Sequence, residues 1–245
     1  MLKNQRHLAI IEYVSEHQFA KVEELSQLLN VSEITIRRDI NELHEENVIK
    51  KVHGGASSLK QNHIAMDIEL ELRRTTNADE KLKIAKIAAD YIPDDSSIYL
   101  DAGTSTSLVI PYLENKNVTV FTHGLHHIEM LNKYNIDTYI IGGHLKTKTL
   151  ATVGSLSIKY LERMNFDIAF IGFNALDPEF GYSTPDEMEA MIKATIIKQS
   201  NVVYFLGDDS KFGRKSGMSF AQISDGYLVS NKHPGDKYLN IKVIK

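Results

Sequence analysis

Two adjacent arginines, Arg37 and Arg38, lie in a stretch of the chain that has the periodicity of an amphipathic helix. Ile36, Ile40 and Leu43 recur at helical spacing and form one apolar stripe, so the opposite side of the helix is left to other side chains. That side carries guanidiniums, an amide, a hydroxyl and a branched apolar group, which suit phosphates, base edges and a thymine methyl. We expect a DNA recognition helix, whose contact residues would be Ser32, Ile34, Thr35, Arg37, Arg38 and Asn41.

The segments around this helix are those that a winged helix-turn-helix needs. Ser32 is a good N-cap, because its hydroxyl can accept a hydrogen bond from an early backbone N–H. Asn4–Glu16 and Lys21–Asn30 predict two further helices, the second of which leads into a tight turn. Val48–Val52 runs into His53-Gly54-Gly55, which predicts a small hairpin, or wing. The wing would place Lys50, Lys51 and His53 along the sugar-phosphate backbone.

The charge balance limits this interpretation. The chain has a formal net charge of −4, and residues 1–60 hold eight lysines and arginines against nine carboxylates. DNA binding would therefore depend on positive charge gathered on one surface. A three-helix bundle with a surface arginine pair is the alternative, since charge on a helix usually indicates only solvation. The ordered series of helix, turn, helix and basic hairpin favours DNA binding.

Length and composition set the outer bounds. A chain of 245 residues can form one large domain or two smaller ones. It has no cysteine, which excludes disulfides and cysteine-ligated metal and fits a reducing cytosol. No apolar run approaches the roughly 18 residues of a membrane span, and the N-terminus lacks the apolar core of a signal peptide. We expect a cytoplasmic protein with no metal, cofactor or membrane partner.

The pattern changes after the wing. Residues 58–76 are polar and weakly periodic and predict a linker between a DNA-binding domain, 1–57, and a second domain, 77–245. In the second domain, short apolar runs alternate with helix-length segments, which predicts an α/β fold with a largely parallel sheet covered on both faces. The predicted strands are Ser97–Leu100, Val118–Phe121, Thr138–Ile141, Ile168–Ile171, Val202–Leu206 and Gly226–Val229. The predicted helices are Asp79–Ile92, Thr106–Leu113, Leu125–Tyr134, Leu156–Met164 and Glu187–Ser200.

Small and polar residues follow several of these strands, and ligands of such sheets bind at the carboxyl ends of the strands. The segment Asp101–Ser107 offers a glycine for close backbone approach, several hydroxyls and a following helix N-terminus, which suits a phosphate. A polar turn that merely caps a helix is the alternative. Lys193 and Lys211 are candidates to hold a negative ligand, unless they are ordinary exposed charges, and His123 could make only a local hydrogen bond. The candidate effector site comprises Asp101, Gly103, Thr104, Ser105, Thr106, His123, Gly143, Asn174, Lys193 and Lys211.

Several of these segments together resemble the DeoR family of bacterial transcriptional regulators. The resemblance is carried by Val31–Ile40, which contains the letters TIRRD, by His53–Ala56, and by Asp101–Thr104, Gly142–Gly143 and Asp209–Gly213. It implies a winged helix-turn-helix joined to an effector domain similar to ribose-5-phosphate isomerase. It also implies a repressor of a sugar-catabolic operon that responds to a phosphorylated sugar. By that similarity the segment 103–106 would cradle the phosphate, with Lys211 on the sugar-phosphate side of the crevice.

Two positions depart from the family pattern. His123 stands where the family often has Asn, and the segment 172–175 reads Gly-Phe-Asn-Ala where the family tends to have Gly-Ala-Asp-Gly. An isomerase needs a carboxylate to move a proton beside a carbonyl, and the amide of Asn174 cannot do so. We therefore favour the regulator over a sugar-phosphate isomerase with an appended helical domain. The carboxylates that could still serve an isomerase are Asp177, Asp186 and Glu187.

Assembly follows from the size of the DNA contact. One recognition helix contacts only a few base pairs, so we expect a dimer or tetramer on repeated half-sites, assembled through the α/β domain. An effector can control DNA affinity only by favouring an arrangement whose helices no longer match, or better match, the operator spacing. The linker is the natural place for that movement. The sequence leaves open the operator, the sugar phosphate, the direction of its effect and the geometry of the oligomer.

Overall fold

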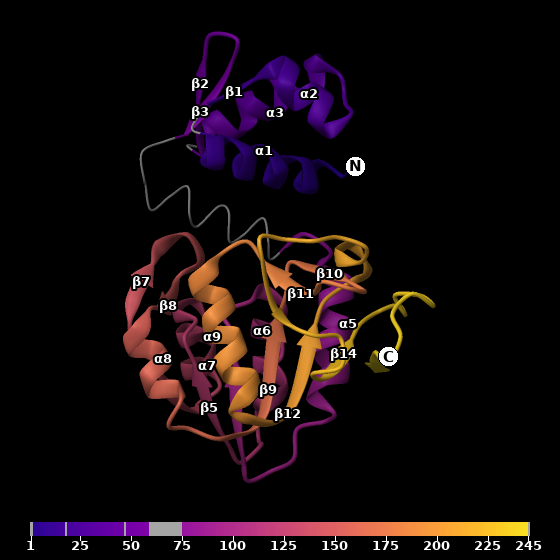
Figure 1. The fold of residues 1–245 in the computed structure, drawn as a ribbon. Helices are drawn as coiled ribbons and strands as arrows, with labels where there is room; N and C mark the ends of the chain where they lie inside the picture. Colours follow the sequence, from indigo (N-terminus) through magenta and orange to yellow (C-terminus); the bar gives the residue numbers. More distant parts are fainter. Residues whose placement is uncertain (1, 18, 47, 59–74, 245) are drawn as a thin grey trace. The chain divides into compact units, whose positions relative to one another are not determined.

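The computed structural model describes residues 2–17, 19–46, 48–58 and 75–244. The chain divides into two compact units, residues 1–76 and 77–245, and each unit has a hydrophobic core of its own (Figure 1). The predicted linker, residues 58–76, lies outside the described residues from 59 to 74. Within the described ranges, every helix is too short or too polar to cross a membrane.

Three helices form the body of the N-terminal unit: α1 (Lys3–His17), α2 (Val22–Leu29) and α3 (Glu33–Glu45). Asn30, with φ 51°, ends α2 in the left-handed conformation, which asparagine tolerates. Ser32 begins α3, since its Oγ accepts the backbone N–H of Thr35 at 3.3 Å. The predicted stripe of α3 is confirmed, because Ile36, Ile40 and Leu43 are all buried in the core of this unit.

The wing is a hairpin of β2 (Ile49–Val52) and β3 (Gly55–Ser58), joined by the two-residue turn His53-Gly54. Gly54 has φ +80°, a conformation that favours glycine. A third strand, β1 (Phe19–Lys21), pairs antiparallel with β3. A side chain at Gly55 would collide with the Ala20 carbonyl, so glycine is what allows β1 to approach.

The C-terminal unit is built on a seven-stranded sheet in the order β15-β14-β12-β9-β4-β5-β6, in which all pairings are parallel. The chain adds β5 and β6 on one side of β4, then returns to place β9, β12, β14 and β15 on the other side. The strand order therefore reverses between β4 and β9, where open α/β sheets form their ligand crevice. The strands are β4 (Ser96–Leu100), β5 (Val118–Thr122), β6 (Asp137–Ile140), β9 (Phe166–Gly172), β12 (Ser200–Leu206), β14 (Tyr227–Val229) and β15 (Lys242–Ile244).

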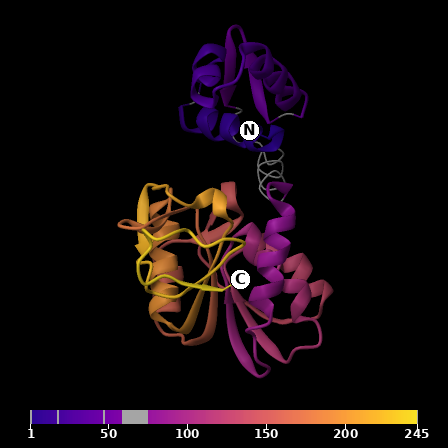
Figure 2. The same ribbon diagram turned by 90° about the vertical axis from the view of Figure 1, so that its right-hand side faces the viewer.

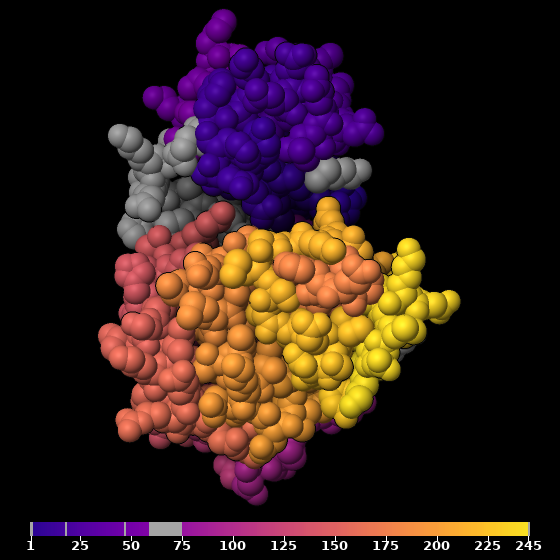
Figure 3. Space-filling model, in the orientation of Figure 1, coloured from indigo at the N-terminus to yellow at the C-terminus, as the bar shows by residue number. Residues whose placement is uncertain are grey.

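Helices cover both faces of this sheet, as predicted (Figure 2). Side chains alternate along β9: Ile168 and Phe170 pack in the cluster that includes α5 (Ala78–Ala89), and Ala169 and Ile171 in the cluster that includes α9 (Glu187–Lys198). The helix α8 (Ser155–Leu161) lies on the α9 side through Leu161. Figure 3 shows part of the surface of this unit, where α9 and the C-terminal residues are accessible.

Two predicted helices are shorter than expected. In place of the predicted helix 106–113 the chain forms α6 (Thr104–Ser107) and a separate 3-10 turn, Ile110–Leu113, because Pro111 cannot donate a backbone N–H. The segment 125–134 begins as a 3-10 turn and becomes helical only in α7 (Ile128–Lys133). Short strands outside the main sheet were not predicted: β7 (His144–Lys146), β8 (Ala151–Val153), β10 (Ala175–Asp177), β11 (Gly181–Thr184) and β13 (Met218–Ala221).

Candidate nucleic-acid interface and anion site

The outer side of α3 is exposed and carries the side chains that the sequence placed there. Ile34 is 80% exposed, an unusual position for a branched apolar residue. The side chain of Arg38 is also 80% exposed, and Arg37 is exposed beside it. Thr35 and Asn41 are half-buried at the flanks. This surface has the composition of one that contacts DNA bases and phosphates.

Both arginines of this surface are held by carboxylates one helical turn away. Arg37 Nη2 lies 3.0 Å from Glu33 Oε2, and Arg38 Nε lies 3.3 Å from Glu42 Oε1. Exposed pairs of this kind are worth only about 0.3–0.5 kcal/mol, so a DNA phosphate or base can replace the carboxylate at small cost. The pairs fix the side chains without making them inaccessible.

The inner side of α3 is attached to α1 by a buried polar cluster that was not predicted from the sequence. Arg6 binds both oxygens of Asp39, through Nε at 2.5 Å and Nη2 at 2.9 Å, and His7 Nε2 lies 3.1 Å from the same carboxylate. Lys3 lies 2.8 Å from Glu42, and this contact lowers the pKa of the Glu42 carboxyl. The bond to Asp39 raises the pKa of the Arg6 guanidinium. The cluster fixes the rotation of α3 and hence the direction of its outer side.

The same cluster contains side chains that could bind a metal ion, although we expected no metal site. His7, Asp39 and Glu42 form the one set of histidine and carboxylate side chains, among the described residues, that lies close enough to hold an ion. Both Asp39 oxygens already accept hydrogen bonds from Arg6. We therefore interpret the cluster as a structural link between helices.

The three predicted contact residues of the wing are all accessible. Lys50 and Lys51 lie in β2 and His53 lies in the turn that follows it, and each of them is exposed. Positive charge on an exposed hairpin next to α3 suits contact with the sugar-phosphate backbone. The wing therefore extends the surface that α3 presents.

In the C-terminal unit, an ion pair lies at the reversal of strand order. Asp101 directly follows β4, and its carboxylate accepts the N–H of Gly172, the last residue of β9, at 3.0 Å. The ammonium of Lys193, from α9, bonds to the same carboxylate and donates to the Gly172 carbonyl at 2.9 Å. All three residues are buried. Asp101 and Lys193, two of the predicted site residues, therefore meet and neutralise each other.

Two aromatic side chains extend this cluster. Burial raises the pKa of the Tyr99 hydroxyl, which stays protonated and shares a hydrogen bond of 2.5 Å with His123 Nδ1. Burial lowers the pKa of His123, and Lys193 lowers it further, although Asp101 opposes both effects. The ring is therefore neutral at pH 7, and its Nε2 lies 3.9 Å from Asp101. Burial raises the pKa of Asp101, but Lys193, His123 and the Gly172 N–H outweigh it, so the net pKa lies below its ordinary value.

The turn after β4 is folded by its own hydroxyl groups. Thr106 Oγ1 donates to the carbonyls of Asp101, at 2.5 Å, and Gly103, at 2.7 Å, and both Thr106 and Ser105 are buried. Thr104 and Gly103 are only half-buried, so they remain the accessible part of the predicted cradle. This division could not be predicted from residue types alone.

A lysine that was not among the predicted site residues lies beside this turn. Lys81, in α5, is only 6% exposed and its Nζ lies 3.4 Å from Thr104 Oγ1. Its neighbour Leu82 is 45% exposed. The sequence contained a signal for the burial of Lys81, because residues 81, 84, 85 and 88 share one helical stripe. A buried cation beside the polar turn that follows β4 is a candidate anion contact.

The remaining predicted effector residues have separate surroundings. Lys211 Nζ lies 5.0 Å from the centre of the Phe173 ring, a cation–π contact just beyond the end of β9. Asn174 is exposed, and its Oδ1 accepts the Thr184 hydroxyl at 3.0 Å. Gly143 is exposed after β6, and a side chain there would collide with Ser157. Gly143 therefore has a packing role in this structure.

Two carboxylates considered for isomerase chemistry have structural roles. Asp177 accepts the backbone N–H groups of Phe180, at 2.9 Å, and Glu179, at 3.0 Å; the first of these bonds contributes most to lowering its pKa, which makes it a poorer base. Asp186 is the N-cap of α9 and accepts the N–H of Glu189 at 2.9 Å. Both side chains fold local turns, so neither resembles a catalytic base.

Two family models together match nearly the whole chain. Residues 6–62 match the family model described as the DeoR-like helix-turn-helix domain, and residues 76–231 match that of the DeoR C terminal sensor domain. A Bacillus subtilis (strain 168) protein described as an uncharacterized HTH-type transcriptional regulator, FruR, is 39% identical over 94% of this chain and 91% of its own length. The glycerol-3-phosphate regulon repressor of Escherichia coli (strain K12) is 31% identical over 91% and 88%, respectively. Among solved structures, ribose 5-phosphate isomerase A from Methanocaldococcus jannaschii has a TM-score of 0.41 at 22% identity, over 55% of this chain and 54% of that chain.

Proposed function

The chain belongs to the DeoR family of transcriptional regulators, and on that premise we propose that it represses an operon of sugar catabolism in the cytoplasm. The observation that carries the proposal is the outer side of α3, where exposed Ile34, Arg37 and Arg38 lie together on a helix with a buried opposite side. Both relatives described above are named as regulators. The isomerase alternative is less well supported, since Asn174 is an amide and Asp177 and Asp186 are committed to local turns.

We assign the DNA contacts to two parts of the N-terminal unit. The helix α3 would lie in the major groove, with Arg38, Asn41 and Thr35 hydrogen-bonding to base edges and Ile34 on a thymine methyl. The wing would follow the sugar-phosphate backbone. Two copies on repeated half-sites supply the specificity that one short helix lacks, so we propose a dimer or tetramer assembled through domain 77–245. The residues assigned to DNA are Ser32, Ile34, Thr35, Arg37, Arg38, Asn41, Lys50, Lys51 and His53.

The family model assigns a sensor to residues 76–231, and we propose that its effector is a sugar phosphate. The crevice at the β4–β9 reversal offers the backbone of Gly103 and Thr104, with Lys81 on one side and Lys211 near the end of β9. The Asp101–Lys193 pair forms a neutral floor, and His123 and Asn174 supply polar contacts for hydroxyls. The name of the Escherichia coli relative includes a phosphorylated metabolite, which supports this class of ligand.

Control of DNA binding requires that the effector favour one arrangement of the two units over another. We place the movement in the linker, residues 58–76, between domains 1–57 and 77–245. Binding of the sugar phosphate would shift the oligomer toward an arrangement whose recognition helices no longer match the half-site spacing, so that the operator is released.

Two measurements on the full chain test this function. Genomic DNA fragments that bind the protein are selected and sequenced, and their affinity is measured by fluorescence anisotropy at several salt concentrations. Thermal unfolding is then measured with a panel of sugar phosphates, the free sugars and inorganic phosphate, because a ligand of the native state raises the melting temperature. We expect one sugar phosphate to raise the melting temperature and to lower operator affinity. A sugar phosphate that raises the melting temperature while operator affinity stays constant would contradict the proposed control.

A further inference from the structure

A hollow of about 490 Å³ lies between the recognition helix and the wing. The helix α3 and strand β2 lie side by side in this unit (Figure 1). The walls of the hollow are formed by one side of α3, by the end of β2 with its turn, and by the first residue of α2. The lining residues are Val22, Arg37, Ile40, Asn41, Lys51, Val52, His53, Gly54 and Gly55.

The polar lining of this hollow suits an anion. Arg37 comes from α3 and Lys51 from β2, so two cations from different elements line the hollow. None of the nine lining residues is acidic. Gly54, in the turn, leaves the hollow open at the wing, because a Cβ added there would have no heavy atom within 4 Å. The apolar side chains of Val22 and Ile40 would suit the ring of a deoxyribose.

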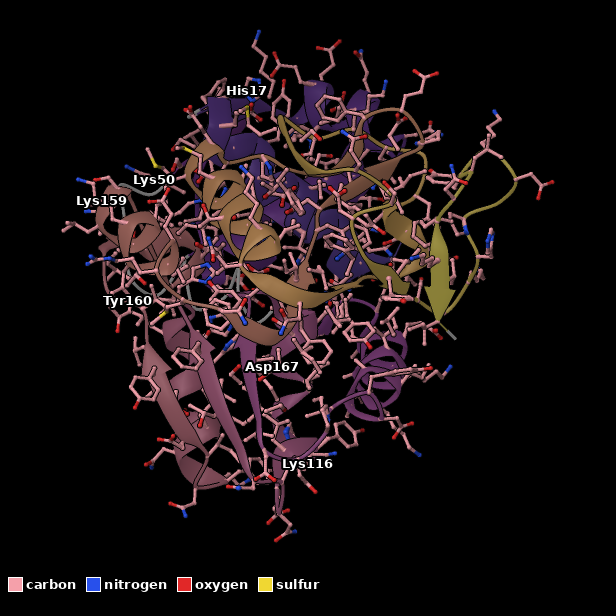
Figure 4. All side chains as sticks on the ribbon, turned by 60° about the horizontal axis from the view of Figure 1, so that its bottom comes forward. His17, Lys50, Lys116, Lys159, Tyr160 and Asp167 are labelled. Atoms are coloured by element: carbon pink, nitrogen blue, oxygen red, sulfur yellow. The ribbon has the colours of Figure 1, made fainter. Side chains whose placement is uncertain are left out.

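The lysine and the arginine next to these two in the sequence, Lys50 and Arg38, do not line the hollow. Successive residues of a strand point to opposite faces, so Lys51 lies on the same face of β2 as Ile49, which is buried in the core, and Lys50 lies on the other. Lys50, labelled in Figure 4, is exposed. The pair Arg37 and Arg38 is divided in the same way: Arg37, which pairs with Glu33, lines the hollow, whereas Arg38, which pairs with Glu42, does not.

We propose that this hollow holds one backbone phosphate of duplex DNA with its deoxyribose, bound jointly by Arg37 and Lys51. The proposal rests on the proposed function, DNA binding by α3, and it assigns different roles to neighbours. Arg37 contacts phosphate, which leaves Arg38 to contact a base. Lys51 shares the phosphate of Arg37, whereas Lys50 contacts the DNA backbone from the other face of β2. One cation comes from α3 and the other from β2, and both bind the same phosphate. This contact sets the register of α3 on the duplex.

Lys51→Gln and Lys50→Gln are a matched pair for testing this assignment, because they remove the same charge from adjacent exposed positions of one strand. The full chain is titrated with its selected genomic fragment and with a scrambled duplex, at 50 to 200 mM salt. The logarithm of the affinity falls with the logarithm of the salt concentration by about 0.9 for each phosphate contacted. We expect Lys50→Gln, which removes a lysine that contacts the DNA backbone alone, to reduce this slope by about 1. We expect Lys51→Gln to reduce it by less, because Arg37 still neutralises the shared phosphate.

Arg37→Gln and the double variant with Lys51→Gln test whether the two cations share one phosphate. We expect Arg37→Gln alone to reduce the slope by well under 1, as Lys51→Gln does, and the double variant to reduce it by about 1, because only the double variant leaves the shared phosphate without a cation. A duplex in which single phosphates are replaced by neutral methylphosphonates identifies the position. At that position, the replacement should weaken binding of the wild type and have little further effect on the double variant.

Three outcomes would overturn the proposal. Equal effects of Lys50→Gln and Lys51→Gln would remove the special position of Lys51, and slope reductions of about 1 in Lys51→Gln and in Arg37→Gln that add to about 2 in the double variant would show two separate phosphates. Either result leaves the proposed function intact. A wild-type chain that binds no genomic fragment would overturn the proposed function and this assignment together. Unchanged melting temperatures in the lysine variants confirm that folding is not the cause.

Discussion

Asp101 and Lys193 meet at the point where the strand order of the sheet reverses. The carboxylate and the ammonium are both buried, and Gly172 is bonded to each of them, through its N–H to Asp101 and through its carbonyl to Lys193. Residues from β4, β9 and α9 are thereby joined beside the proposed effector crevice. The pair acts as a fixed part of the scaffold, and its contribution to stability can be measured.

Lys193→Met should lower the free energy of unfolding by about 3–5 kcal/mol, because it leaves a buried carboxylate without its cation. Urea denaturation followed by tyrosine fluorescence measures the change. Lys83→Met is the control, since Lys83 forms an exposed pair with Glu80 at 3.0 Å and such pairs contribute at most about 1 kcal/mol. Equal losses of unfolding free energy in Lys193→Met and Lys83→Met would contradict a stabilising role for the buried pair. Adding Asp101→Asn to Lys193→Met should restore part of the loss.

His123 should make the C-terminal unit less stable as the pH falls below about 6.5, the ordinary pKa of histidine. Burial lowers the pKa of His123 in the folded state. The unfolded chain therefore takes up the proton first, and stability present above pH 6.5 is lost as the pH falls toward the folded-state pKa. The lowered pKa of Asp101 acts only at a lower pH, below about 4. His123→Gln should reduce the loss of melting temperature between pH 7 and pH 5, and an unchanged loss would contradict this.

Arg38→Ala should weaken binding to the selected operator by about 1–3 kcal/mol, with a much smaller effect on a scrambled duplex, because Arg38 is assigned to a base. Anisotropy titrations with both duplexes measure the difference. Arg163→Ala, which removes an exposed arginine from the other unit, is the control and should leave both affinities unchanged. If Arg38→Ala alters neither the affinity nor its salt dependence, Arg38 is not part of the interface.

Glu33→Gln should tighten DNA binding about two-fold, because it releases Arg37 from an exposed ion pair worth about 0.3–0.5 kcal/mol. Glu45→Gln removes the same charge from an exposed position of α3 that has no ion pair with Arg37 or Arg38. The difference between the two variants separates the local effect on Arg37 from the general effect of net charge. Identical affinities would mean that Glu33 does not compete with DNA for the guanidinium.

Strongly periodic segments were predictable from the sequence. The buried stripe of α3, the turn at Asn30 and the parallel sheet covered on both faces are confirmed, because each depends on a local pattern that tertiary packing reinforces. The family was predictable as well, from motifs in both halves of the chain. Strands such as β1, with three residues and one buried side chain, were missed because they are too short to have a period.

The residue types of the candidate site were predictable from the sequence, but the contacts between its side chains were not. Asp101 and Lys193 are 92 positions apart, and nothing local indicates that they neutralise each other. Thr106 carries the same hydroxyl as Thr104, yet its side chain is used to close the turn. The assignments of individual residues to DNA and effector stay predictions. Asp167, labelled in Figure 4, is a further example: its carboxylate accepts the N–H and hydroxyl of Ser97, a pairing that joins β9 to β4 far from any motif.

A backbone hydrogen bond joins the tip of the wing to the start of α2, from the N–H of Val22 to the carbonyl of Gly54 at 3.0 Å. This amide proton therefore reports on both elements. Its exchange with solvent requires the hairpin to separate from the first residue of α2, so the protection of Val22 against deuterium measures how often the wing opens. Protection equal to that of the helix interior would show that this unit meets DNA as one preformed body, without an ordering step on contact.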